Sequence, residues 1–299
     1  MDGHDQMAYD RGTSIFSPDG RLYQVEYARE AVKRGSSTVG VKTSSGVVLA
    51  VDKRVSSSLM EGESIEKLHV VDDHLLAASA GHVADGRRLV DELRRDAQVN
   101  RLRYGEPIDA KTATRHVSDL VQAYTQVGGA RPFGAALLIA GVDRDGTPRL
   151  YETDPSGTVD GWQAVAVGAH RGDVQSFLEA EYDPAFDLED ATALALRAIS
   201  VPDEERPAVD QVAVATVDVE TRTVTVLDDD ALASHLDALP APENDAGGED
   251  AGGEEAGGEE AGGEEAGGED PGGEDAASEA VDSSEDVDGD DAADDSGAE

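Results

Sequence analysis

The amino-acid sequence predicts an α+β protein built as a four-layer αββα sandwich, in which helices cover two antiparallel sheets. Segments with strand and helix periodicity follow one another in blocks: strands, two helices, strands, two helices, strands. Most neighbouring strand segments are separated by short turns, which favours hairpins and antiparallel pairing. Helices that occur in pairs are typical of layers packed outside sheets.

The strand segments are runs of apolar and β-branched residues bounded by turn residues. We expect strands at 38–43, 47–52, 68–71, 75–80, 134–142, 149–154, 163–168, 212–218 and 223–227. Short polar turns at 44–46, 72–73 and 220–221 join three of these pairs into hairpins.

The helical segments carry apolar residues at i, i+3, i+4 and i+7, the spacing of one buried helix face. We expect helices at 86–97, 113–124, 173–182, 188–200 and 229–236. About 239 residues without a Pro/Gly/Ser linker favour one domain rather than two.

The N-terminal segment differs from this pattern. Residues 1–16 are polar, and the turn Ser17-Pro18-Asp19-Gly20 precedes a short helix that we expect Gly35 to end. Leu22, Val25, Ala28 and Val32 form one stripe of this helix, while Tyr23 and Tyr27 form a second. The helix could dock on its own core or lie between subunits. We favour the second, because two stripes present more apolar surface than one neighbour covers.

Composition excludes several classes of protein. The 299 residues include no cysteine, which rules out disulfides, thiolate metal sites and a cysteine nucleophile. No run of about 18 apolar residues and no secretory signal is visible, so we expect a cytoplasmic protein. A net charge of −41 argues against binding to nucleic acid or anionic lipid, which requires clustered Lys and Arg.

The acidic charge is concentrated at the C-terminus. Residues 240–299 hold 24 acidic residues and no Lys or Arg, and six AGGEE-like pentads occupy 246–275. A glycine-rich period of five cannot bury enough apolar surface to offset its ordering entropy, so we expect a disordered tail. We interpret it as a solvating, self-repelling appendage; an interaction tail is the alternative. The body has only five lysines and a net charge of −17, which indicates adaptation to high salt; an acidic protein with a purely local acidic function is the alternative.

Several motifs in order make the chain resemble a known family. They are YDR at 9–11, FSPDGRL at 16–22, QVEYA at 24–28, GSSTVG at 35–40, IEK at 65–67, YTQVGGARPFG at 124–134 and DPSG at 154–157. Over residues 7–236 they resemble the α subunits of the archaeal 20S proteasome, and the composition looks haloarchaeal. The resemblance implies the N-terminal nucleophile hydrolase-like αββα fold. It also implies a mobile gate segment (1–16), an α-type domain (17–239) and an added tail (240–299).

The resemblance further implies a function. A non-catalytic α subunit would form the outer seven-membered rings, contact the catalytic β subunits and gate the path of unfolded substrates into the proteolytic chamber. It would dock a regulatory AAA ATPase through the C-termini of that activator, supporting ATP-dependent, ubiquitin-independent degradation. Neither a cofactor nor a metal is implied.

The family's functional positions map onto three sets of residues. Those that hold the open gate match Tyr9, Asp10, Arg11, Pro18 and Tyr27. Those of the activator pocket match Lys67, Gly35, Gly81, Glu26 and Arg29. Those of the pore constriction match Gly128, Gly129 and Arg131. At position 82 archaeal relatives often carry an apolar residue, whereas this chain has His82. The resemblance therefore does not fix which activator C-terminus the pocket prefers.

Two other functions are considered. The catalytic relatives use an N-terminal threonine, and here Ser36, Asp52 and Lys67 fall at the matching positions, so a self-processing threonine/serine-type N-terminal nucleophile peptidase is one alternative. Ser36 lies inside the chain after the full α signature, which disfavours it, and Asp52 is better interpreted as a strand-end residue with local hydrogen bonds. A binding protein that acts through its acidic tail is the second alternative. The histidines show no metal-ligand spacing.

Overall fold

The structure is a computed structural model that describes residues 20, 22–57, 59–126, 130–202 and 206–240. Its described residues contain two five-stranded sheets whose paired strands are all antiparallel. The first has the order β10-β9-β2-β1-β8. Its strands are β1 (Thr38–Lys42), β2 (Gly46–Asp52), β8 (Ala164–Val167), β9 (Val212–Asp218) and β10 (Val224–Val226). The second has the order β3-β4-β5-β6-β7. Its strands are β3 (Leu68–Asp72), β4 (Leu75–Gly81), β5 (Ala135–Val142), β6 (Pro148–Thr153) and β7 (Val159–Gly161).

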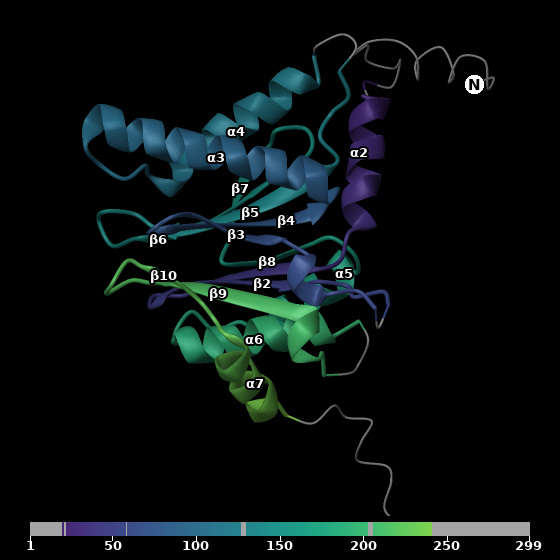
Figure 1. The fold of residues 1–299 in the computed structure, drawn as a ribbon, viewed down its shortest axis with the longest axis vertical. Helices are drawn as coiled ribbons and strands as arrows, with labels where there is room; N and C mark the ends of the chain where they lie inside the picture. The colour runs from purple at the N-terminus through teal and green to yellow at the C-terminus, as the bar shows by residue number, and fades with distance from the viewer. Residues whose placement is uncertain (1–19, 21, 58, 127–129, 203–205, 241–299) are drawn as a thin grey trace, which may run out of the picture. The chain divides into compact units, whose positions relative to one another are not determined.

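Helices cover the outer face of each sheet (Figure 1). The β3–β7 sheet is covered by α3 (Val83–Tyr104) and α4 (Ala110–Tyr124), and the β1-containing sheet by α5 (Arg171–Glu181) and α6 (Leu188–Ser200). The last helix, α7 (Asp229–Ala238), packs on α6, and two short 3₁₀ helices are η1 (Gly62–Ser64) and η2 (Val209–Gln211). The first described helix, α2 (Tyr23–Lys33), contacts β4 and β5. The predicted αββα sandwich is therefore confirmed.

Three apolar cores hold the layers together. One lies between the two sheets, and one lies between each sheet and its helices. The sheets approach closely at Gly40, where an added Cβ would lie 2.8 Å from Leu150 Cδ1. Strand β2 is buried on both faces, which explains why 47–51 is a continuous apolar run rather than an alternating one.

Most predicted elements are confirmed, with shifts of a few residues at their ends. Helix α3 is longer than predicted at both ends. Residues 83–85 precede the apolar stripe, and the exposed Arg101 and Arg103 follow it. Gly105, with φ of 70°, follows the last residue of the helix. Strand β7 and both 3₁₀ helices were not predicted, since three residues are too few to show a period. Gly35 follows the end of α2 as expected, but its φ is not positive, so it is not a left-handed cap.

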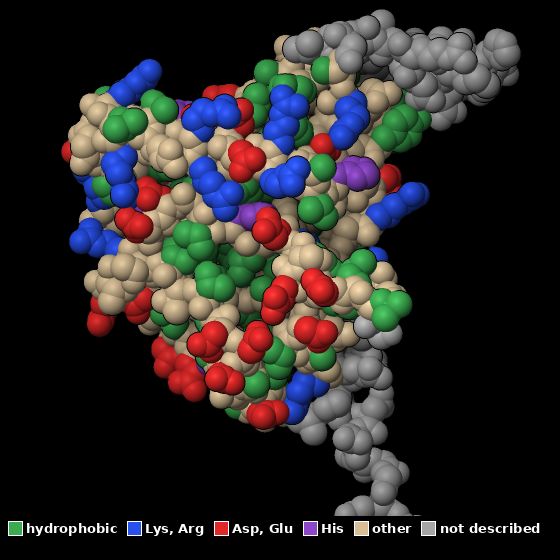
Figure 2. All heavy atoms as spheres, viewed as in Figure 1, with side chains coloured by type: hydrophobic (Ala, Val, Ile, Leu, Met, Phe, Trp, Pro, Cys, Tyr) green, Lys and Arg blue, Asp and Glu red, His purple; other side chains and the backbone are tan. Residues whose placement is uncertain are grey.

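The two helical layers differ in charge (Figure 2). Helix α3 carries six arginines, whereas α7 has three aspartates and no Lys or Arg. The acidic side chains visible in Figure 2 gather on the α6–α7 side of the molecule. No described helix is long and apolar enough to cross a membrane.

Candidate functional site

Helix α2 borders the groove that we consider as the functional site. Its buried side chains Val25, Ala28 and Val32 face the body, while Tyr27 is 46% exposed. Glu26 lies in the first turn and Lys33 in the last, where each charge favours the helix dipole. Beside α2 is a groove of about 510 Å³, lined by Tyr27, Glu30, Ala31, Arg34, Gly35, Gly81 and His82.

Three glycines allow the backbone segments beneath this groove to touch. A Cβ on Gly35 would lie 2.2 Å from the Gly81 nitrogen, and one on Gly81 would lie 2.3 Å from the Gly134 oxygen. Gly81 also has φ of +104°, which L side chains rarely adopt. A Cβ on Gly134 would lie 2.5 Å from His82 Cδ2. Gly35 is therefore required by close packing rather than by helix termination.

Lys67 lies just before β3, and its side chain is buried, with the residue only 5% exposed. Its Nζ donates to main-chain oxygens of Ser36 (3.0 Å), Ser37 (3.3 Å) and Asp52 (2.8 Å), and to Ser36 Oγ (2.6 Å). Burial lowers the pKa of Lys67 to about 7, opposed by the charge of Asp52 and reinforced by Arg54. Lys67 does not line the groove; it supports the segment that follows Gly35.

The structure brings together the three residues that match the catalytic positions of the peptidase relatives. Besides its contact with Lys67, Ser36 Oγ donates to the Asp52 main-chain oxygen (2.6 Å). The Asp52 carboxylate accepts from the Arg54 nitrogen (2.7 Å), the local hydrogen bond expected of a strand-end residue. Gly35, in turn, is held on both sides: its nitrogen donates to Val32 O and its oxygen accepts from the Ala169 nitrogen (2.7 Å). The residue before Ser36 is therefore held in the fold by hydrogen bonds that involve both its nitrogen and its oxygen.

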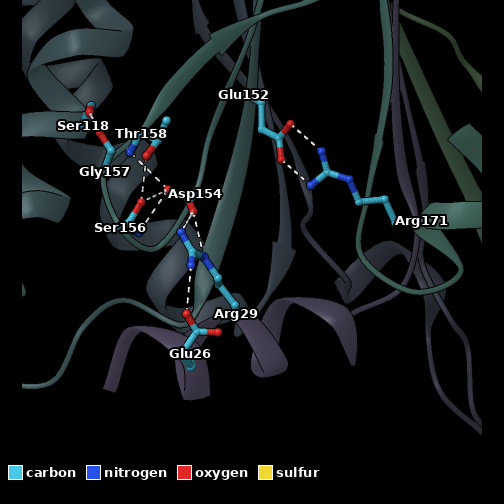
Figure 3. Close-up of polar contacts among 9 residues, drawn as sticks. All are labelled: Glu26, Arg29, Ser118, Glu152, Asp154, Ser156, Gly157, Thr158 and Arg171. Atoms are coloured by element: carbon cyan, nitrogen blue, oxygen red, sulfur yellow. Dashed lines mark hydrogen bonds and ion pairs between the residues drawn. The ribbon is translucent and has the colours of Figure 1, made fainter. Parts of the chain in front are cut away.

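Arg29 and Glu26, both predicted pocket residues, pair with each other and with a residue that sequence reasoning did not select. Arg29 Nε and Nη2 donate to Asp154 Oδ2 (3.0 and 2.8 Å), and Nη1 donates to Glu26 (3.2 Å), as Figure 3 shows. The sequence signal for Asp154 was present in the DPSG motif at 154–157. Two residues earlier on β6, Glu152 binds Arg171 through two hydrogen bonds (2.7 and 2.9 Å), also drawn in Figure 3.

Arg131, predicted at the pore constriction, binds Asp85 at the start of α3 through two hydrogen bonds (2.6 and 2.8 Å). Asp85 Oδ2 also accepts from the Gly134 nitrogen (2.8 Å). Burial opposes ionisation of Asp85, but the hydrogen bonds from Arg131 and Gly134 outweigh it and lower the pKa of this carboxyl. Asp85 was not selected from the sequence, where it looks like an ordinary first-turn acid.

The remaining predicted site residues lie outside the described residues. They are Tyr9, Asp10, Arg11 and Pro18 of the predicted gate, and Gly128 and Gly129 of the predicted constriction. Within the described part of the chain, no three His, Asp or Glu residues are grouped so as to hold a metal ion.

The sandwich, with a helix placed before the strand that begins at Thr38, defines an N-terminal nucleophile hydrolase-like fold whose nucleophile position lies inside the chain. The family model for proteasome subunits matches residues 32–217, and the model for the N-terminal signature of A-type proteasome subunits matches residues 9–31. The chain belongs to the proteasome subunit family.

Three curated relatives show which branch of the family the chain is similar to. The proteasome α subunit 1 of Haloferax volcanii is 60% identical over 242 residues, 80% of this chain and 96% of the relative. The proteasome α subunit of Halobacterium salinarum is 59% identical over 234 residues, 78% and 92% of the two chains. The proteasome α subunit 1 of Haloarcula marismortui is 58% identical over 233 residues, 78% and 89%. The resemblance to haloarchaeal α subunits is confirmed.

Proposed function

We propose that this chain is a non-catalytic α subunit, forming seven-membered outer rings of a 20S proteasome core in the cytoplasm. One observation carries the proposal: the α signature at 9–31 includes most of helix α2, and this helix packs against the body. A discarded propeptide would not need the buried face of α2 or the contact of Gly35 with Gly81. Ser36 consequently has no free α-amine, which N-terminal nucleophile chemistry requires.

Intact-mass measurement of the chain purified from assembled barrels tests this proposal. We expect a mass that includes Ser36 and the residues before it. Loss of residues 1–35 would identify Ser36 as a processed nucleophile and refute the non-catalytic assignment.

We further propose that the segment before α2 gates the path of unfolded substrates to the β subunits. Residues 1–16 are polar and have no apolar stripe, as expected of a segment that changes between arrangements. Deletion of residues 2–12 should raise peptide hydrolysis by reconstituted α/β barrels. An unchanged rate would contradict gating.

The groove beside α2 is proposed to receive the C-terminus of a regulatory AAA ATPase. Tyr27 provides an exposed aromatic surface on one wall, and the Gly35–Gly81 contact lets a peptide approach the backbone. Lys67 lies beneath the segment after Gly35, outside the lining of the groove, and its hydrogen bonds to the Ser36 and Ser37 oxygens hold that segment in place for docking.

Lys67→Ala should abolish activator stimulation while seven-membered rings still assemble. Lys111→Ala, which removes an exposed lysine on α4, is the matched control and should be stimulated normally. Normal stimulation of the Lys67→Ala barrel would remove Lys67 from the docking site.

A further inference from the structure

The shape of the α2 groove depends on the position of one helix. Tyr27, Glu30 and Ala31 belong to α2 itself, and Arg34 and Gly35 directly follow it. The opposite wall is formed by Gly81 and His82, where β4 leads into α3. A small shift of α2 would therefore change the distance between the two walls.

A part-buried ion pair connects α2 to the second sheet. Two nitrogens of Arg29 donate to Asp154 Oδ2, while the third nitrogen donates to Glu26 of the same helix. All three guanidinium nitrogens are thus engaged within the chain, and Arg29 does not line the groove. Its contact with Asp154 joins positions 125 residues apart.

The turn that carries Asp154 is itself held in place. Asp154 Oδ1 accepts from the Ser156 nitrogen (3.0 Å), Ser156 Oγ (2.6 Å) and the Thr158 nitrogen (3.1 Å), so each carboxylate oxygen has a separate task. Gly157 adopts φ of +82°, and a Cβ there would lie 2.8 Å from Gln122 Cβ of α4. Ser118 of α4 donates a hydrogen bond to the Gly157 oxygen (Figure 3).

The carboxylate is suited to this task electrostatically. Burial opposes ionisation of Asp154, but hydrogen bonds from Ser156 and Arg29 outweigh it and lower its pKa. The charged form therefore persists at neutral pH, and hydrogen bonds from a guanidinium to a carboxylate are stronger than those between neutral groups.

We propose that Asp154 is a positioning residue for activator docking: through Arg29 it holds α2 where the groove has the width that the activator's C-terminus requires. The inference rests on the proposed docking function and deepens it. Arg29 then acts through helix position and makes no contact with the activator. The DPSG motif at 154–157 acquires a role as the fixed point that joins α2, β6 and α4.

Two conservative substitutions and their combination test the inference. Asp154→Asn keeps an oxygen for Ser156 and Thr158 but replaces the oxygen that Arg29 needs with an amide that cannot accept. Arg29→Gln removes the other partner. Asp145→Asn is the matched control, since Asp145 caps a similar turn by accepting from the Thr147 nitrogen (2.9 Å) and makes no hydrogen bond to α2.

The first readout is the concentration of a haloarchaeal regulatory AAA ATPase that half-maximally stimulates peptide hydrolysis by reconstituted barrels. Each single variant should raise it about fivefold, within the range of mutations that alter coupling without touching a ligand. The double variant should match either single variant, because both remove the same interaction. Unstimulated hydrolysis, ring assembly and the control should be unchanged. Normal stimulation of Asp154→Asn, or additive losses in the double variant, would overturn the inference.

The second readout requires no activator. Hydrogen exchange of the α2 amides should be faster in Asp154→Asn and Arg29→Gln than in the parent barrel, while α6 amides should be unchanged. Unchanged α2 exchange would overturn the positioning role by itself. If no ATPase stimulates even the parent barrel, the proposed docking function is refuted. Faster α2 exchange in the variants would then still support the role of Asp154 in holding α2.

Discussion

Lys67 allows the burial of a charge to be measured as a pH-dependent stability. Its pKa is about 7 in the folded chain, against the ordinary value of 10.5. Between these two pH values the unfolded chain binds more protons than the folded chain, so the free energy of unfolding rises with pH. The penalty of burying the ammonium is therefore fully present below pH 7 and fades as pH rises toward 10.5.

The size of the effect follows from the shift. Each pKa unit corresponds to about 1.4 kcal/mol, and Lys67 is half deprotonated at pH 7, so its contribution grows by about 2 kcal/mol between pH 7 and pH 9. Lys67→Met lacks this group. We expect the stability of the parent relative to Lys67→Met to increase by that amount over this interval, because other titrating groups are common to both chains.

Urea unfolding of the two chains at pH 7 and pH 9, at constant salt and protein concentration, provides the measurement. The single tryptophan, Trp162, is a partly buried fluorescent probe. Lys33→Met, which removes an exposed lysine of α2, should show no such pH-dependent difference. If the free energies of unfolding of the parent and Lys67→Met differ by the same amount at both pH values, the reasoning is refuted. The oxygens around Nζ would then keep Lys67 protonated.

Three further predictions concern stability, each measured by urea unfolding. Gly35→Ala should destabilise the chain by about 2 kcal/mol or more, because its Cβ meets Gly81 backbone, whereas Gly172→Ala in α5 meets open space and should not; equal effects would contradict the packing argument. Asp187→Ala should lower the free energy of unfolding by about 1 kcal/mol, because Asp187 caps α6 by accepting from the Asp190 nitrogen (2.9 Å). Asp109→Ala is the control, since Asp109 makes no such bond at α4, and an equal loss of stability there would argue against capping. Asp85→Asn should cost about 1–3 kcal/mol at neutral pH. That difference should shrink as pH falls through the lowered pKa of Asp85, and a pH-independent difference would contradict it.

The layer order could be predicted from the sequence because periodicity records burial. The predicted bounds of helix 188–200 and strand 212–218 agree with the structure. Each segment is long enough for the spacing of its buried residues to be visible in the sequence. Strand β7 has three residues and is held by its register with β6, which leaves no periodic signal. The ends of α3 were missed because neither residues 83–85 at its start nor the exposed Arg101 and Arg103 near its end continue the apolar stripe.

The candidate site was predictable only where a motif identified it. Lys67 and Gly35 were selected through the family resemblance, but neither the buried environment of Lys67 nor the Gly35–Gly81 contact could be predicted from the sequence. Asp154 lay within a motif that had no assigned task, and its partner Arg29 was expected in the pocket. Contacts between positions 125 residues apart leave no local pattern, so the pair was not anticipated.

The sequence by itself determined the αββα layers, the family, the acidic composition and the internal position of Ser36, because burial period, motif order and charge are properties of the linear chain. Only the tertiary structure decided which charges are paired and which backbone segments touch. Lys67 is held by oxygens of two main-chain segments, at 36–37 and at 52, and α2 is held by a carboxylate on a distant turn. Both depend on distances of a few ångströms between residues that only folding brings together.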